Sequence, residues 1–218
     1  LPTLLRASPK ETVDLMLSNE TWTDAMKIIQ TFIEDASTFS ETNKTLLTHI
    51  LRYLETITSK PSGVAFGEKS VHNVLLDVYI KLLDTSPTVV SALNKYIFEA
   101  VDAAGNPHYD IQRAIRSCEA SGVHRSTVYA YFVSKEFDSA IHIALQTLQD
   151  IELAKMVTTK AAALHEGDPK DDDVQKKLWI EIAKWSIQKS GALDKQMESV
   201  SQDEQRASIR EALNFLDQ

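Results

Sequence analysis

Apolar side chains recur along this chain with the period of an α-helix. In residues 21–36 the apolar positions fall on one arc of about 160° when successive residues are turned by about 100°, and residues 45–58 repeat the pattern. In residues 71–83 and 178–187 the apolar arc widens to roughly 240° and 220°. A helix with so wide an apolar arc needs neighbours on several sides.

The wide apolar helix at 71–83 keeps one narrow polar strip, formed by Asn73, Asp77 and Lys81. These three residues recur every four positions, so they lie along one side of a helix. The rest of this helix is apolar, so the sequence predicts neighbours on several of its sides.

Glycine and proline separate the helical stretches. The chain contains only six of each, and most of them fall where a helix must end or restart. No Asn-Gly or Asp-Gly hairpin signal is present, and no strand pattern repeats between helices. The pattern predicts helices near 9–18, 21–36, 41–58, 68–84, 87–102, 109–121, 124–134, 136–147, 150–163, 170–189 and 201–217.

About 10–11 helices joined by short connectors leave two all-α architectures, a globular bundle and an α-solenoid of stacked antiparallel helical hairpins. The mixture of half-buried and almost entirely apolar helices favours the solenoid. A large bundle built around a central helix would give the same mixture. No linker composition marks a domain boundary, so residues 1–218 are interpreted as a single solenoid segment.

Composition and charge narrow the function classes. The chain has 218 residues, of which 43% are hydrophobic, and no apolar run approaches the roughly 20 residues needed to cross a bilayer. It starts at Leu1 without a signal sequence, which we interpret as the start of an internal fragment of a larger protein. A net charge of -8 argues against binding to nucleic acid or directly to anionic lipid.

The residues that usually carry chemistry do not form a recognisable site. The six histidines include no HExxH motif, and no glycine-rich phosphate loop or GxSxG elbow is present. His72 lies within an apolar arc, which is typical of a hydrogen-bonded core histidine. The single cysteine, Cys118, excludes a disulfide and is best explained as a small buried apolar residue. The sequence predicts no catalytic residue, cofactor or metal, and hence no enzyme.

Residues 109–187 carry a resemblance to a known repeat. Segments 109–118, 122, 129–131 and 136–145 resemble the clathrin heavy chain repeat, in which small residues let paired helices approach closely and aromatic residues fill the space between layers. The pattern continues in 150–155, passes an acidic linker and ends in 176–184. In that order and spacing it resembles the vacuolar protein sorting-associated protein 18 family, the class C core subunit of the HOPS and CORVET tethering complexes. Residues 1–108 show only a generic solenoid character.

The resemblance implies a subunit with an N-terminal β-propeller, a long α-solenoid and a C-terminal RING zinc domain. This chain contains only the solenoid part, because one cysteine cannot form a RING domain. The implied function is a scaffold and interaction segment in tethering, docking and fusion of vesicles between endosome and vacuole or lysosome.

The implied partners are other class C tethering subunits and, indirectly through the full complex, SNAREs and Rab GTPases. The implied location is the cytoplasm, peripheral on late endosome and vacuole or lysosome membranes. Two alternatives remain: a peptide-binding helical-repeat adaptor of another trafficking coat or tether, and an all-helical enzyme with a deep pocket.

The terminal repeats are the candidate interfaces, because cutting a solenoid exposes apolar faces that neighbouring repeats would cover. The expected interface residues are Leu4, Leu5, Val13, Ile209, Leu213 and Leu216. Trp179 and Trp185 fit the buried arc of their helix, so core packing is the first interpretation for both, ahead of anchoring a partner.

Overall fold

The computed structural model describes residues 2–19, 27, 29, 41–60, 64–164 and 169–194. Helices make up the named elements of this part of the chain, and its only β-type pairing is one isolated bridge between Val101 and Pro107. The helices are α1 (Pro2–Ala7), α2 (Pro9–Asn19), α4 (Glu41–Thr58), η1 (Val64–Gly67), α5 (Lys69–Lys81), α6 (Pro87–Glu99), α7 (Ile111–Ala120), α8 (His124–Val133), α9 (Phe137–His142), η2 (Ile143–Thr147), α10 (Ile151–Leu164) and α11 (Pro169–Asp194). The fold is all-α, as the sequence predicts.

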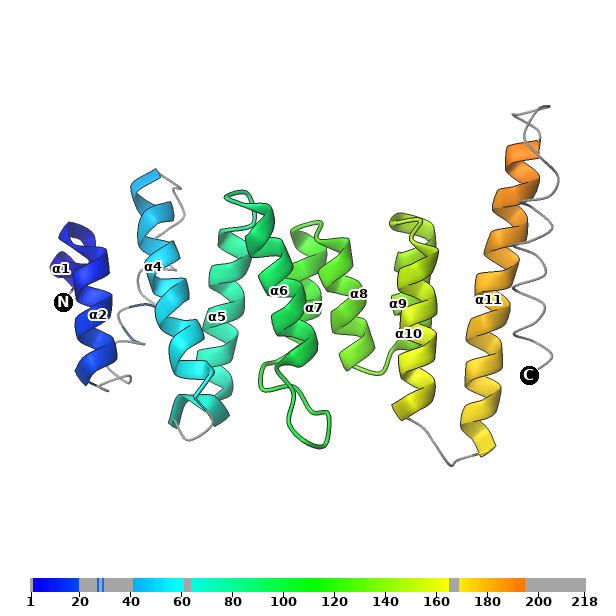
Figure 1. Cartoon of the computed structure of the whole chain (residues 1–218), viewed down its shortest axis with the longest axis horizontal. Coiled ribbons are helices and arrows are strands. Elements are labelled where there is room, and N and C mark those ends of the chain that lie inside the picture. The colour runs from blue at the N-terminus through cyan, green and yellow to red at the C-terminus, as the bar shows by residue number, and fades with distance from the viewer. Residues whose placement is uncertain are drawn as a thin grey trace. The chain divides into compact units, whose positions relative to one another are not determined.

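The chain forms two compact units, Leu1–Ser126 and Thr127–Gln218, and the division falls within α8. In the first unit, α1 packs on α2, α2 on α4, and α4 on α5. Helix α5 contacts both α6 and α7. Figure 1 shows α2, α4 and α5 as neighbouring rods in chain order. Packing on the next helix and the next but one is the contact pattern of an α-solenoid.

Local signals start and stop the helices of the first unit. The Ser86 hydroxyl accepts a hydrogen bond from the Thr88 amide at 3.2 Å, immediately before Pro87 opens α6. The Asp110 carboxylate caps α7 in the same way, by accepting from the Arg113 amide at 3.0 Å. After α7 the chain turns at Gly122, whose φ of +66° favours glycine.

The second unit is built around α10, which contacts both α9 and α11. Helix α9 runs directly into η2, a π-helical turn. The sequence predicts one regular helix over 136–147, so the position is right but the last turn is wider. The Lys177 ammonium of α11 lies 2.9 Å from the Asp138 carboxylate of α9. The buried core of this unit includes Ile141, Leu145, Leu153, Val157, Leu178 and Ile182.

The predicted helix boundaries hold within a few residues for the described elements. The predicted helix at 41–58 matches α4 (Glu41–Thr58). Helix α1 (Pro2–Ala7) has no counterpart in the prediction, because six residues are too few for a periodic pattern. The prediction at 201–217 lies outside the described residues, and so does that at 21–36 apart from residues 27 and 29.

Candidate functional site

The first unit contains a pocket of about 410 Å³ between α4, α5, α6 and the loop after α6. Its apolar floor comes from Leu75, which is buried, and its mouth lies among exposed polar side chains. The other lining residues are Glu55, Thr58, Ser59, His72, Tyr79, Ala92, Lys95, Tyr96, Glu99, Ala100, Val101 and His108. Such a mixture of aromatic, apolar and a few charged groups is typical of a binding site.

Aromatic rings cluster around Tyr96 in this pocket. The Tyr96 ring centroid lies 6.0 Å from that of His72, 5.6 Å from that of Tyr79 and 6.0 Å from that of Tyr109. The His72 Nδ1 and the Tyr96 hydroxyl are hydrogen-bonded, and the His108 ring stacks on His72 at 5.3 Å. The cluster holds α5, α6 and the loop after α6 together through rings rather than through aliphatic packing alone.

One hydrogen bond at the pocket mouth fixes a carboxylate. The Tyr79 hydroxyl donates to Glu55 Oε1 at 2.6 Å, and the rest of Tyr79 is buried. Burial raises the pKa of Tyr79 well above its ordinary value, and the hydrogen bond and the charge of Glu55 raise this pKa further. Tyr79 therefore stays a neutral donor, and Glu55 is held as an oriented anion.

The structure confirms the predicted burial of two residues that could carry chemistry, His72 and Cys118. His72 is 2% exposed and hydrogen-bonded, which confirms the interpretation of a core histidine. Cys118 is fully buried, and burial raises the pKa of its thiol to about 12. A buried neutral thiol is a poor nucleophile, so Cys118 acts as an apolar core residue.

The predicted interface at the start of the chain is only partly accessible. Leu4 on α1 is 54% exposed, but Leu5 and Val13 are 0% exposed. The expectation that all three are exposed is therefore wrong for Leu5 and Val13, because α1, α2 and α4 pack together over them. The residues expected at the other end, Ile209, Leu213 and Leu216, lie outside the described residues.

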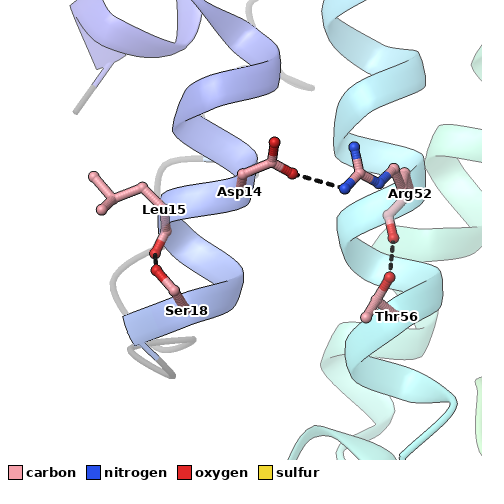
Figure 2. A network of polar contacts seen from close by, with 5 residues as sticks. All are labelled: Asp14, Leu15, Ser18, Arg52 and Thr56. Atoms are coloured by element: carbon pink, nitrogen blue, oxygen red, sulfur yellow. Dashed lines mark hydrogen bonds and ion pairs between the residues drawn. The ribbon is translucent and has the colours of Figure 1, made fainter.

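Leu15 on α2 joins Leu4 as an exposed apolar residue that the sequence does not single out. It is 50% exposed, and in Figure 2 it points away from α4. The same figure shows Asp14 and Arg52 linking α2 to α4, with 2.7 Å between carboxylate and guanidinium. Leu15 lies outside the buried side of α2, which is formed by Thr12, Val13 and Met16, so the helical period could have identified it as exposed.

The two tryptophans of α11 are not fully buried core residues. Trp179 and Trp185 are both half-buried, and the Lys189 ammonium lies 4.6 Å from the centroid of the Trp185 ring. The first interpretation, core packing, is therefore correct only in part, because each side chain is partly buried and partly exposed. The fully buried positions of this helix are Leu178 and Ile182.

Neither a cluster of metal ligands nor a membrane-spanning helix is found in the part of the chain that the structure describes. No group of three or more potential metal ligands comes together there. None of the described helices is long and apolar enough to cross a bilayer.

Comparison with models of protein families shows which family the chain belongs to. Residues 1–187 match the model described as "VPS18, alpha-solenoid domain, second half". The chain belongs to the VPS18 family. The match confirms the resemblance seen in 109–187 and extends it over residues 1–108, where the sequence shows only solenoid character. It also confirms the solenoid over the globular bundle.

Relatives from a fish, a fly and a plant are named as vacuolar sorting proteins of the same number. The chain is 27% identical over 202 residues to a "Vacuolar protein sorting-associated protein 18 homolog" of Danio rerio, covering 92% of this chain and 18% of the relative. A Drosophila melanogaster homolog of the same name is 27% identical over 184 residues, covering 84% of this chain and 16% of the relative. "Vacuolar sorting protein 18" of Arabidopsis thaliana is 25% identical over 216 residues, covering 99% of this chain and 19% of the relative.

The VPS18-family chain spans less than a fifth of the length of these relatives. No solved structure shows a significant match to it. The pocket between α4, α5 and α6 lies inside the residues that the VPS18 solenoid model matches.

Proposed function

We propose that this chain is a scaffold and interaction segment of a class C subunit of the HOPS and CORVET tethering complexes. It acts in tethering, docking and fusion of vesicles between endosome and vacuole or lysosome. It does so without catalysis, on the cytoplasmic side and peripheral to these membranes. The observation that carries the proposal is the match of residues 1–187 to the second half of the VPS18 α-solenoid.

The physical mechanism of such a segment is geometric. Within each unit, helices pack on their neighbours, so the position of one such helix sets the position of the next. Buried apolar residues hold these helices together, and exposed ion pairs such as Arg52–Asp14 add a small contribution. A stack of this kind presents partner-binding residues at fixed spacings. The partners we propose are the other class C subunits, with SNAREs and Rab GTPases reached indirectly through the full complex.

The alternative of a peptide-binding adaptor in another coat or tether gains support from the α4–α5–α6 pocket, which has room for a side chain of a bound protein. The two functions are compatible, because a tethering subunit also binds its partners through such surfaces. The enzyme alternative gains no support from the pocket. Its tyrosines have raised pKa values, its charged groups are exposed at the mouth, and His72 is buried, hydrogen-bonded to Tyr96 and stacked on His108.

Co-purification tests the proposal. The tagged 218-residue chain is co-expressed with each class C subunit and each accessory subunit in turn, and the complexes are measured by size-exclusion chromatography. We expect a stable complex with at least one class C subunit. A helical solenoid of similar length from an unrelated coat protein serves as the control. Failure to form a complex with any of these subunits would reduce the segment to a passive spacer.

A further inference from the structure

We propose that the α4–α5–α6 pocket binds the guanidinium group of an arginine side chain from a partner protein. The inference depends on the proposed function only in assigning that arginine to a partner protein. The pocket is defined by Glu55, His72, Tyr79, Lys95, Tyr96 and Glu99 and lies wholly within the first unit.

The first argument is the oriented charge of Glu55. Its Oε1 accepts a hydrogen bond from the Tyr79 hydroxyl at 2.6 Å, while its side chain remains exposed at the pocket mouth. Among the described residues no lysine or arginine pairs with Glu55. A carboxylate that is held in place and lacks a cation is prepared for a charge-assisted hydrogen bond.

The second argument is the balance of charge at the mouth. Glu99 lies on the α6 side of the pocket, and its contact with Lys95 is long at 3.9 Å, with both side chains mostly exposed. Such a pair contributes little and is readily exchanged. Two carboxylates and one lysine leave the mouth acidic, in a chain whose net charge is -8. A cationic ligand is favoured.

The third argument is the shape of the pocket and its aromatic lining. The volume of about 410 Å³ is at the lower end for ligand pockets, so it suits one long side chain better than a peptide segment. Tyr79, Tyr96 and His108 line it beside the apolar Leu75. A planar guanidinium stacks on rings and pairs with a carboxylate at its edge, which a lysine ammonium does not do as well.

Amide chemical shifts of the ¹⁵N-labelled 218-residue chain test the inference. The probe is Nα-acetyl-arginine methylamide, and the matched control probe is the citrulline analogue, which has nearly the same shape but no charge. We expect saturable shifts centred on the amides of residues 55, 79, 96 and 99 with the arginine probe, and no saturation with citrulline. Because these are small-molecule probes, failure of co-purification would leave this result unaffected.

Variants make the test specific. Glu55→Gln should weaken binding of the arginine probe by about tenfold, because a charge-assisted hydrogen bond is lost. Glu11→Gln, at an exposed position of α2 outside the pocket, should leave it unchanged. Lys95→Gln should strengthen it by removing the positive charge at the mouth. Equal affinity of the Glu55→Gln and unaltered chains, or binding of N-acetyl-aspartate at the same amides instead, would overturn the inference.

Discussion

The Arg113 guanidinium of α7 forms an ion pair with the Asp77 carboxylate of α5 and donates two hydrogen bonds to it, with Nη2 2.6 Å from Oδ2 and Nε 3.4 Å from Oδ1. One turn earlier on α5, the Asn73 side-chain carbonyl accepts a hydrogen bond from the Asp110 amide at 2.8 Å. Both α5 residues belong to the narrow polar strip of this helix. The start of α7 packs on that strip, and these two contacts fix how α7 is positioned on α5.

A double-mutant cycle on Arg113 and Asp77 should show a favourable coupling of about 0.5–1 kcal/mol. The two side chains are 49% and 21% exposed, so solvent screens part of the attraction, and the coupling should fall as salt is added. The measurement is the free energy of unfolding in urea for Arg113→Ala, Asp77→Ala and both together. The same cycle on Lys95 and Glu99, which are 73% and 60% exposed, should give a smaller value. Equal couplings for the two pairs would contradict this account.

The two faces of α11 should respond differently to truncation. Leu178 is 1% exposed, so Leu178→Ala should lower the free energy of unfolding by about 2–5 kcal/mol. Ile187 on the same helix is 54% exposed, so Ile187→Ala should change it by no more than about 0.5 kcal/mol. Thermal and urea unfolding followed by circular dichroism measure both. Similar losses from the two variants would mean that the burial described for this helix is wrong.

Cys118 should resist thiol reagents until the chain unfolds. Its side chain is fully buried and burial raises its pKa to about 12, so at neutral pH almost none of it is the reactive thiolate. We expect reaction with Ellman's reagent to be slow in buffer and complete within the mixing time in denaturing guanidinium. Fast, stoichiometric reaction of the folded chain would show that the first unit opens readily.

The buried tyrosines should make the fold lose stability in alkali. Burial raises the pKa of Tyr79, Tyr96 and Tyr109, so these phenols are neutral when folded and ionise near pH 10 only when unfolded. Their contribution is complete below about pH 10 and is lost as the pH rises toward their folded-state pKa. The urea midpoint should therefore drop steeply above about pH 10.

The variant Tyr109→Phe gives the control for this pH dependence. It removes one buried phenol together with its 2.6 Å hydrogen bond to the Ile97 carbonyl, and should cost about 1–3 kcal/mol at neutral pH. Its stability should then fall less steeply with rising pH than that of the unaltered chain. A parallel pH dependence in both proteins would show that Tyr109 titrates normally in the folded state.

Local periodicity was enough to predict the longer helices among the described residues, but not the short α1 and η1. The predicted helix at 41–58 and α4 (Glu41–Thr58) coincide because one apolar arc and one polar face persist for five turns. The burial of Leu5 and Val13 could not be predicted, since it depends on which helices pack over them. The same reason applies to Asn73 and Asp77: the sequence marks them as a polar strip but does not show that α7 packs on it.

The pocket could not be predicted from the sequence. Its rings come from two helices, α5 and α6, and a loop, with His72 and Tyr96 separated by 24 positions. No spacing rule links residues on successive hairpins, because the register between them is set by packing. The one available signal was His72 within an apolar arc, which indicated a buried polar partner without identifying Tyr96.

The most direct test of the scaffold account is hydrogen–deuterium exchange on the segment within the complete tethering complex. Exchange at the amides of residues 1–218 is compared between the isolated full-length subunit and the assembled class C complex. The account predicts slower exchange on assembly in at least one continuous patch over exposed helix faces of the segment, while buried core amides change little. Identical exchange throughout the segment in both states would contradict the claim that it holds other proteins.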